Sequence, residues 1–459
     1  MIKYKTLGIT GLWDKTESAN INLSKLIYRK KIDEIKKRFK KNYIEVITGP
    51  RQSGKTTLLF MLINELLKKH DYRNILYVNL DTVIDSGIFE ETLRFDEIIE
   101  RAKPAGGRVY LFIDEIQRLK NPGKMLKGLF DLKRNLKIFV SGSSSIEIRS
   151  KTKEFLTGRK RETLLYPVSF AEYVDYEGAL PGRLNSLKLT KKTLNDWAEN
   201  EKKYGKYLTG IMENVLITGC YPGVITKKRR DERIEELAEL YNSYIKKDIA
   251  DFMRIENVEV FNRIVKALAG QIGNLLNKAE IGSLTQSNQI TLTKYLSILQ
   301  DTFVTRYLSP FVTQRRNEIK SAGKCFFVDN GLRNFSFRQF GSAENRPDKG
   351  MLVENTVVSE ILKNIGILQE VFYWRTKGGA EVDIVIRSGQ KIIPVEIKSG
   401  SVNQGALPRG YHSFINGFSP EYGFLLNRDR FGIEKIKNTV IYYVPFHWFC
   451  LFAEKWMRL

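Results

Sequence analysis

The sequence contains few residues of the kind that cross-link a fold or bind zinc. Its 459 residues include three cysteines, Cys220, Cys325 and Cys450, and three histidines. The cysteines are odd in number and widely separated, which excludes a disulfide framework, and the histidines supply no ligand pair for a zinc site. We therefore expect a fold held by hydrophobic cores in a reducing, cytoplasmic environment.

Long hydrophobic runs are also absent. No stretch of about 18 apolar residues occurs, so the sequence predicts no transmembrane helix. The N-terminus, MIKYKTLGIT, lacks the apolar block of a signal peptide. We expect no membrane partner. At 459 residues the chain is longer than one compact core usually holds, so we expect roughly two to four domains, and 42% hydrophobic residues supply material for their cores.

Acidic residues are the third shortage. The chain has 75 Lys and Arg against 52 Asp and Glu, a formal net charge of +23. A field of this sign attracts polyanions, and nucleic acid is the commonest one inside cells. Basic clusters at 29–41, 227–230 and 315–316 indicate where contact with nucleic acid, DNA in the first place, is expected. The alternative is a solvated basic surface, as in proteins from hot environments.

A glycine-rich loop is the strongest motif. A short apolar run, 43–48, precedes it, and a helical pattern follows. The loop and the first helical residues are Gly49, Pro50, Arg51, Gln52, Ser53, Gly54, Lys55, Thr56 and Thr57. This is the complete G-x-x-x-x-G-K-[ST] pattern in a strand–loop–helix context. The glycines let backbone N–H groups face phosphate oxygens, Lys55 can reach the outer phosphates, and Thr56 can ligate Mg²⁺.

Two adjacent carboxylates end a later apolar run. Residues 109–113 lead directly into Asp114 and Glu115, which is the Walker B arrangement. Asp114 would hold Mg²⁺ through water, and Glu115 would orient and deprotonate the attacking water. An intervening strand at 75–80 fits a parallel α/β sheet. The presence of Glu115 favours hydrolysis over binding alone.

Two further side chains are candidates for contact with the γ-phosphate. The run 136–140 ends in Ser141, whose hydroxyl could touch the phosphate or the attacking water, with Ser143 as the second choice. A plain Gly/Ser turn is the alternative. Arg159 precedes a fifth strand at 162–167, so it could reach the nucleotide of a neighbouring subunit in a homo-oligomer. A surface arginine is the competing interpretation.

The sequence favours ATP over GTP. Guanine specificity would need an N/T-K-x-D reader after a late strand. The nearest string, Asn277-Lys278-Ala279-Glu280, has Glu in place of Asp and lies outside the core. We therefore expect ATP with Mg²⁺ at the loop.

These motifs together resemble a known family. The run 47–57, the segment Phe112-Ile113-Asp114-Glu115-Ile116-Gln117, the Ser-Gly-Ser-Ser-Ser strand end and the Leu-x-Gly-Arg motif at 156–159 are similar to AAA-type ATPases of archaea and bacteria. Those proteins carry a C-terminal, restriction-endonuclease-like domain of formerly unknown function. The resemblance covers nearly the whole chain. It implies catalytic roles for Lys55, Glu115 and Arg159.

The pattern in the middle of the chain predicts a winged helix. Helices at 259–276, 278–284 and 289–299 precede a wing strand at 303–308. The exposed candidates for DNA contact are Ser287, Asn288, Gln289, Thr291 and Lys294. A helix–turn–helix that serves only for packing is the alternative.

A β-hairpin is predicted near the C-terminus. Residues 379–387 alternate in their first half, 388–389 form a two-residue turn signal, and 390–398 return as a second strand. Pro394 inside the second strand predicts a sheet edge or a bulge. Because side chains alternate with period two, acidic residues of both strands share one face.

The acids of this hairpin suggest a metal site. Pairing across the turn would set Asp383 opposite Pro394 and Glu396 diagonally, about 7–8 Å away. With Lys398, this spacing resembles the core of PD-(D/E)XK nucleases, and Glu354 on an upstream helix could supply another acid. The resemblance implies that Glu354, Asp383 and Glu396 bind Mg²⁺ or Mn²⁺ and that Lys398 helps to activate a water. A salt-paired hairpin is the alternative.

The expected fold class is α/β, with a P-loop AAA-type parallel sheet core, a helical lid, a winged-helix-like middle domain and an α/β restriction-endonuclease-like C-terminal domain. The expected segments are a basic helical segment (1–41), the ATPase core (42–170), the lid (171–255), the winged-helix-like domain (256–320) and the nuclease-like domain (321–459). Two functions stay open. One is an ATPase that acts on nucleic acid and can cut it, and the other is an ATP-dependent switch whose nuclease-like domain only binds.

Overall fold

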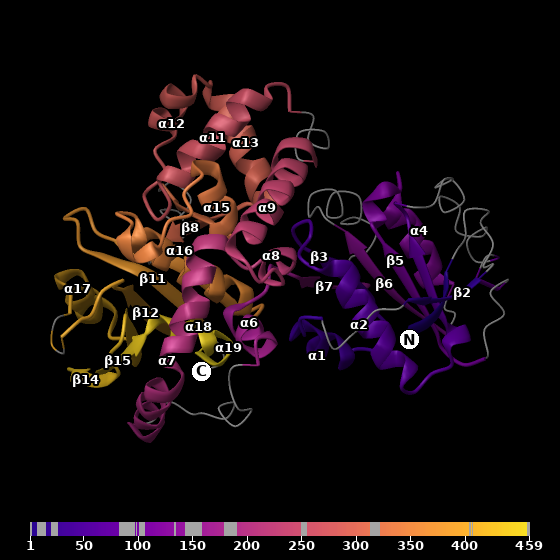
Figure 1. Cartoon of the computed structure of the whole chain (residues 1–459), viewed down its shortest axis with the longest axis horizontal. Helices are drawn as coiled ribbons and strands as arrows, with labels where there is room; N and C mark the ends of the chain where they lie inside the picture. Colours follow the sequence, from indigo (N-terminus) through magenta and orange to yellow (C-terminus); the bar gives the residue numbers. More distant parts are fainter. Residues whose placement is uncertain are drawn as a thin grey trace. The chain divides into compact units, whose positions relative to one another are not determined.

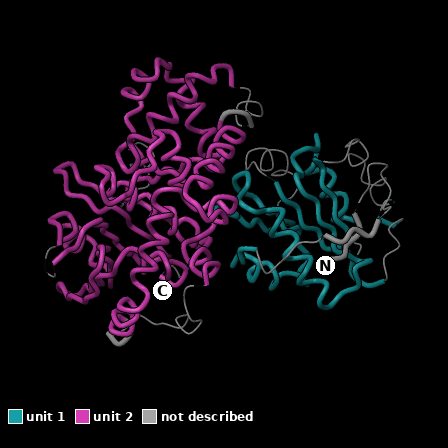
Figure 2. Tube along the Cα trace, viewed as in Figure 1, with its two compact units in different colours: residues 1–167 teal, residues 168–459 magenta. Residues whose placement is uncertain are grey.

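The computed structural model describes most of the chain. The described residues are 2–6, 15–19, 26–81, 97, 99–100, 106–132, 135–142, 158–178, 191–248, 255–312, 322–403, 405 and 407–456. The chain divides into two compact units, residues 1–167 and residues 168–459, each with its own large β-sheet (Figures 1 and 2). None of the described helices is both long enough and apolar enough to span a membrane.

The first unit contains a seven-stranded sheet in the order β2-β1-β4-β5-β6-β3-β7. The strands are β1 (Ile2–Thr6), β2 (Lys15–Ala19), β3 (Ile44–Thr48), β4 (Ile75–Asn79), β5 (Val109–Asp114), β6 (Leu136–Gly142) and β7 (Lys160–Leu164). The described helices include α1 (Lys31–Lys36), α2 (Lys55–Leu67) and α4 (Pro122–Asp131), with 3-10 turns η2 (Tyr72–Asn74) and η4 (Ile116–Arg118). From β4 to β7 all neighbouring strands are parallel, which confirms the predicted parallel core.

Apolar side chains fill both faces of this sheet, because a parallel sheet is covered by helices on each side. On one face Val46 and Ile113 belong to a core with Leu126 of α4. On the other face Ile47 belongs to a core with Leu62 of α2. Since β6 lies between β3 and β5, the carboxyl ends of these three strands meet at one edge of the sheet.

The N-terminal segment 1–41 differs from the expected helical segment. It contains the strands β1 and β2, and its described helix is only the short α1. β1 pairs antiparallel with β2 and parallel with β4, so this segment extends the sheet. The run Ile2-Lys3-Tyr4-Lys5 alternates apolar and polar residues, which is a strand pattern.

The second unit contains an eight-stranded sheet in the order β14-β15-β13-β12-β11-β10-β8-β9. The strands are β8 (Thr305–Pro310), β9 (Lys324–Phe327), β10 (Gln369–Arg375), β11 (Glu381–Ser388), β12 (Lys391–Ile397), β13 (Tyr422–Asn427), β14 (Gly432–Ile436) and β15 (Thr439–Pro445). The described helices before β8 include α6 (Phe170–Tyr176), α7 (Lys191–Thr218), α8 (Pro222–Ile225), α9 (Arg230–Tyr241), the π-helix η6 (Asn242–Asp248), α11 (Val258–Gly270), α12 (Lys278–Thr285) and α13 (Gln289–Asp301). Those after β9 include α15 (Asn330–Phe337), η7 (Ala343–Asn345), α16 (Lys349–Asn364), α17 (Arg409–Phe418), α18 (Phe446–Leu451) and α19 (Ala453–Trp456).

The helices of segment 171–255 pack within the second unit. Asn334 of α15 donates hydrogen bonds of 2.9 Å to two carbonyls at the C-terminal end of α7. Trp197 of α7 stacks on Trp448 of α18 with ring centroids 5.7 Å apart. The segment that we expected to form a lid therefore shares one compact unit with the C-terminal sheet.

Three helices and a β-hairpin lie where the winged helix was expected. The helices α11, α12 and α13 follow the predicted order, but the first ends at Gly270 and does not reach 276. Gly273 has a φ of +76°, and its N–H donates to the Cys325 carbonyl at 2.9 Å, so the chain turns toward the sheet there. β8 pairs antiparallel with β9 and parallel with β10. The expected wing is thus continuous with the C-terminal sheet.

The hairpin of β11 and β12 has a register that differs from the prediction. Ser388 pairs with Lys391, so the turn residues are Gly389 and Gln390. Gly389 has a φ of +61°, which a two-residue hairpin turn requires at its first position. Continuing the register one step beyond the Ile384–Val395 pair sets Asp383 opposite Glu396. The predicted pairing of Asp383 with Pro394 is therefore wrong by two positions.

Pro394 also lies elsewhere than predicted. Its strand β12 is an interior strand between β11 and β13, and Pro394 pairs in regular register with Val385. The parallel pairing with β13 begins one residue later, at Val395. The missing N–H of proline thus falls just before that ladder starts, which explains how an interior strand tolerates it.

Candidate functional site

The glycine-rich loop joins β3 to α2 in the predicted way. Gly49 lies so close to the Leu165 carbonyl that a Cβ at this position would overlap with its oxygen. Gly54 caps α2 with a φ of 93°. Both positions therefore require glycine. Helix α2 begins at Lys55, so the loop lies at the positive end of the helix dipole, where anions are favoured.

Lys55 is held against its own loop. Its side chain is buried, with 5% of the residue exposed. The ammonium donates to the carbonyls of Gly49 at 3.2 Å and Pro50 at 2.9 Å. Burial lowers the pKa of Lys55, while Glu115 and Asp114 oppose that shift. A cation is thus fixed beside the loop with two carboxylates near it.

Asp114 connects three strands and a helix. One carboxylate oxygen accepts from the Thr56 hydroxyl at 2.6 Å and from the Tyr77 hydroxyl at 3.1 Å, and the other accepts from the Ser141 hydroxyl. The structure therefore brings together the predicted residues Thr56, Asp114 and Ser141. Tyr77 was missed because it lies in a run that reads as an ordinary buried strand. Its hydroxyl, buried in a sheet, needed a polar partner, which is the signal that could have found it.

Glu115 follows β5 in a left-handed backbone conformation with a φ of 57°, which is uncommon for a residue other than glycine. Burial raises the pKa of its carboxyl, Asp114 raises it further, and Lys55 and Gln117 act in the opposite direction. The Gln117 amide donates to the carboxylate and holds its position. A carboxylate with a raised pKa is a stronger base at neutral pH.

Arg159 lies at the opposite edge of the sheet from its own loop. Its carbonyl accepts from the N–H of Ile44, at the start of β3, whereas the loop follows the end of that strand. Five residues of strand span about 16 Å. The Arg159 guanidinium donates to Asp131 at 3.2 Å. Arg159 is thus placed away from its own nucleotide site. Its contact with the nucleotide of a neighbouring subunit stays a prediction. The second choice, Ser143, lies outside the described residues.

Arg29 is a residue that sequence reasoning did not single out. It is buried, with 4% exposed, and its guanidinium donates to the Ser53 carbonyl at 2.6 Å. It also donates to the carbonyls of Tyr166 at 2.7 Å and Pro167 at 3.5 Å. In the sequence it was one member of a basic cluster, and no local pattern distinguishes it from the exposed members.

The predicted acids of the second unit also come together. The Asp383 carboxylate accepts from the N–H of Ile397 at 2.8 Å, and Lys398 donates to Glu396 at 2.7 Å. Glu396 is buried, with 4% exposed. Burial and then Asp383 raise the pKa of Glu354 to about 8 and that of Glu396 to about 7. Burial also raises the pKa of Asp383.

Lys324 of β9 is the unexpected member of this acid cluster. Its side chain is 4% exposed, and its ammonium lies 3.5 Å from Glu354 and forms an ion pair with Glu381. Burial alone would lower the pKa of Lys324, but Glu354 and Glu381 raise it. The lysine was missed because it comes from a strand distant in sequence. It supplies the positive charge that the buried acids need.

The acid cluster has the donor chemistry for a divalent cation. Oε2 of Glu396 makes no hydrogen bond among the described residues, and Oε1 of Glu354 makes only the ion pair with Lys324. Carboxylate oxygens are the ligands that Mg²⁺ and Mn²⁺ prefer. In the part of the chain that the structure describes, however, no three acidic, His or Cys side chains converge on one point. Lys324 balances Glu354 and Glu381 here, and Lys398 pairs with Glu396.

The candidates for DNA contact lie on α12, α13 and the turn between them. Gln289 and Lys294 are exposed, and Ser287 and Thr291 are half-buried. Asn288 caps α13 by accepting from the N–H of Thr291 at 2.8 Å. Lys294 forms an exposed ion pair with Glu256 at 3.3 Å.

Comparison with known protein families finds matches for three separate parts of the chain. Residues 41–174 match the family described as "AAA domain", residues 210–342 match a domain of unknown function (DUF8612), and residues 349–449 match another (DUF4143). An uncharacterized protein of Haemophilus influenzae is 26% identical over 371 residues, 78% of this chain and 82% of that protein. Uncharacterized protein MJ1544 of Methanocaldococcus jannaschii is 25% identical over 418 residues, 88% of this chain and 87% of that protein.

Among solved structures, the Walker-type ATPase PABY2304 of Pyrococcus abyssi matches with a TM-score of 0.43 and 16% identity, over 68% of this chain and 96% of that one. The family matches agree with the geometry of the first unit, where the loop, Asp114 and Glu115 meet at the carboxyl edge of a parallel sheet. The chain thus contains an AAA-type P-loop domain at residues 41–174 and a DUF4143 domain at residues 349–449.

Proposed function

We propose that the protein binds ATP with Mg²⁺ at the Gly49–Thr56 loop and hydrolyses it. The observation that carries this proposal is the 2.6 Å hydrogen bond from the Thr56 hydroxyl to Asp114. These are the two side chains that would hold Mg²⁺, and the ion when bound would neutralise charge on the phosphates. Thr56 and Asp114 belong to two separate motifs. An accidental glycine-rich turn would not bring two such residues into contact.

The other residues of the site have separate tasks. Lys55, fixed beside the loop, would pair with the outer phosphates. Glu115, held by Gln117, would take a proton from the attacking water, since its raised pKa suits a base. Ser141 bonds to Asp114 and would fix the orientation of that carboxylate.

The test is ATP turnover by the full chain. Wild type should release phosphate with Mg²⁺, and Lys55→Ala should lose ATP binding and turnover. Lys68→Ala is the matched control, because Lys68 follows the same helix but its side chain is 58% exposed. A Lys55→Ala protein that hydrolyses ATP at the wild-type rate would overturn the proposal.

We propose further that this ATPase acts on nucleic acid, with DNA as the first choice. The net charge of +23 and the helix–turn–helix arrangement of α12 and α13 support it. DNA binding should weaken steeply with salt, since released counterions drive it. If DNA neither binds to the protein in about 50 mM salt nor changes its ATP turnover, the proposed action on nucleic acid is overturned.

A second candidate function is metal-dependent cleavage of nucleic acid at the acid cluster. The observation that favours it is the pair of opposed carboxylates, Asp383 and Glu396, with Lys398 bonded to Glu396. For this function Glu354, Asp383 and Glu396, which do not converge on one point in the described structure, would have to move together to hold Mg²⁺ or Mn²⁺, whose chemistry is activation of a water toward phosphorus. The rival is a cluster that binds nucleic acid or a partner without cutting, balanced by Lys324.

Cleavage assays separate these two alternatives. Linear, branched and single-stranded DNA would be incubated with Mg²⁺ or Mn²⁺, with wild type, Asp383→Asn and a control, Glu370→Gln. Glu370 lies on the neighbouring strand, and its side chain is 56% exposed and paired with Arg387. Cleavage lost only in Asp383→Asn supports the nuclease. DNA left intact by wild type with either metal supports the binding-only alternative.

A further inference from the structure

The last residues of the first unit are held by the same arginine that holds the P-loop. One Arg29 nitrogen donates to the Ser53 carbonyl inside the loop, and the other donates to the carbonyls of Tyr166 and Pro167. The guanidinium is planar and rigid, so it fixes these two backbone segments relative to each other. A shift of Ser53 must therefore move Arg29 or break one of its hydrogen bonds.

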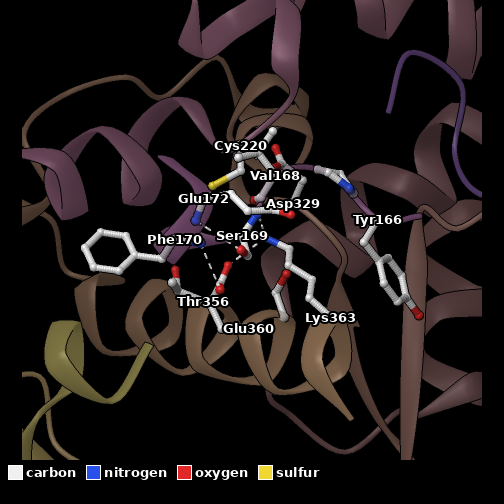
Figure 3. A network of polar contacts seen from close by, with 12 residues as sticks. Tyr166, Val168, Ser169, Phe170, Glu172, Cys220, Asp329, Thr356, Glu360 and Lys363 are labelled. Atoms are coloured by element: carbon white, nitrogen blue, oxygen red, sulfur yellow. Dashed lines mark hydrogen bonds and ion pairs between the residues drawn. The ribbon is translucent and has the colours of Figure 1, made fainter. Parts of the chain in front are cut away.

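The first residues of the second unit are held just as firmly. Lys363 of α16 donates to the Val168 carbonyl at 3.0 Å, and the N–H of Phe170 donates to the carboxylate of Glu360, also of α16, at 3.0 Å. The two side chains form an ion pair of 2.7 Å. Figure 3 shows both of them beside the backbone of Val168 and Phe170.

These charged groups are buried, which makes their hydrogen bonds costly to break. Glu360 is fully buried and Lys363 is 9% exposed. A buried charge is stable only while it is paired and hydrogen-bonded. The N–H of Val168 is also bound, to the Cys220 carbonyl at 2.9 Å. The backbone from 168 to 170 is thus fixed to α16 and to the connection between α7 and α8.

Helix α16 also carries Glu354 of the acid cluster. Glu354 lies six residues before Glu360 on one continuous helix, a rise of about 9 Å. A single covalent segment, 166–170, thus has the P-loop arginine at one end and the helix of the acid cluster at the other.

We propose that segment 166–170 is a link that transmits the nucleotide state of the P-loop to α16, with Arg29 as the positioning residue on one side and the Glu360–Lys363 pair on the other. This inference rests on the proposed binding of ATP. When nucleotide moves the Ser53 backbone, Arg29 shifts the Tyr166 and Pro167 carbonyls. The displaced chain then changes the hydrogen bonds of Val168 and Phe170 to α16. Coupling of this kind is reciprocal, so changes at Glu360 must alter the affinity of the loop for ATP.

The first experiment measures amide hydrogen exchange in the full chain with and without ATP and Mg²⁺. In wild type the amides of Val168 and Phe170 should change their exchange rate by about fivefold or more, the lower end of common coupling strengths. Arg29→Lys keeps the charge but cannot span the two backbone segments, so this change should be lost. Arg38→Lys is the matched control. Arg38 bonds Glu45 and Thr163 in the same unit, and the change should persist.

The second experiment tests the reverse effect, in which a change on α16 alters ATP binding at the loop, and it measures the ATP affinity by calorimetry. Glu360→Gln should shift the dissociation constant of ATP by about fivefold, although Glu360 belongs to the second unit. Ser359→Ala is the control, since Ser359 is the neighbour of Glu360 on α16 and its hydroxyl donates to the Val328 carbonyl, away from segment 166–170. Ser359→Ala should bind ATP like wild type.

Each outcome decides the question. If wild type binds ATP but amide hydrogen exchange at 168–170 does not change with ATP, the link is overturned and the proposed ATPase function still stands. An exchange response that survives in Arg29→Lys, or is lost equally in Arg38→Lys, also overturns it. Equal ATP affinity in wild type and Glu360→Gln does the same. A wild type that does not bind ATP overturns both the link and the proposed function.

Discussion

The Thr56 hydroxyl donates a 2.6 Å hydrogen bond to Asp114, a residue 58 positions further along the chain. Thr56 is the second residue of α2, which follows β3 and the loop, and Asp114 ends β5, which lies two strands from β3 in the sheet. The contact exists because the carboxyl ends of parallel strands meet at one edge, where ligands of α/β folds bind. It joins the two halves of the proposed magnesium site.

Removing either half of this contact should abolish hydrolysis. We expect Thr56→Ala and Asp114→Asn to lower kcat by about 100-fold or more, which corresponds to about 2.7 kcal/mol of transition-state stabilisation. Phosphate release at saturating ATP and Mg²⁺ measures it. Tyr77→Phe is the control, because it removes a hydrogen bond to Asp114 without removing either proposed metal ligand. It should cost about 1 kcal/mol of stability and change kcat far less.

Glu115→Gln should separate binding from hydrolysis. The amide keeps the shape of the side chain but cannot accept a proton, so ATP should bind nearly as in wild type while turnover falls by about 100-fold or more. Because burial raises the pKa of Glu115, the acid limb of the wild-type rate profile should have its midpoint above the ordinary value of about 4.3. A profile with its midpoint at that ordinary value would contradict the assignment.

Lys324→Met should destabilise the second unit in a pH-dependent way. It leaves Glu354 and Glu381 without their buried counter-charge, and such a loss costs about 3–5 kcal/mol. At pH 6 the cost should be smaller than at pH 9, because the pKa of Glu354, already raised to about 8, lets that acid stay protonated. Denaturant unfolding at both pH values measures the difference.

The same variant tests the competition between Lys324 and a metal ion. With the ammonium removed, Mn²⁺ should bind the acid cluster more tightly than in wild type and restore part of the lost stability. Calorimetry with Mn²⁺ alone measures the affinity. Equal Mn²⁺ binding by Lys324→Met and wild type would contradict a cluster in which lysine takes the place of a metal.

Wild-type stability should fall as pH rises from about 4.5 to about 8. In the folded chain the pKa of Glu354 is raised to about 8 and that of Glu396 to about 7, whereas an unfolded glutamate titrates at about 4.3. The folded state therefore binds more protons in this window, and deprotonation favours unfolding. Glu354→Gln should flatten the dependence, and Glu370→Gln should leave it unchanged. Denaturant midpoints across this range measure it.

Much of the first unit could be predicted from the sequence. The loop, the strand ends at Asp114 and Ser141 and the helix after Lys55 are local features. Each depends on a few consecutive residues whose spacing fixes both the backbone and the chemistry. The helices α12 and α13 were predictable for the same reason, since Asn277 and Asn288 cap them.

Other features depended on residues distant in sequence. The hairpin register depended on whether Gly389 takes the first or the second position of the two-residue turn, and in the structure it takes the first. Segment 171–255 was expected to form a lid, and the structure shows that its helices pack with α15 and α18. No local sequence pattern predicts these packing partners.

The sequence by itself determined the chemistry of the loop and the presence of acids on one face of the hairpin, because motif spacing and the period of two are properties of neighbouring residues. Only the tertiary structure placed Tyr77 on Asp114, Arg29 on the loop and Lys324 among the acids. The physical reason is that a buried polar group must find a partner wherever the fold brings one. Those partners are separated along the sequence by tens of residues.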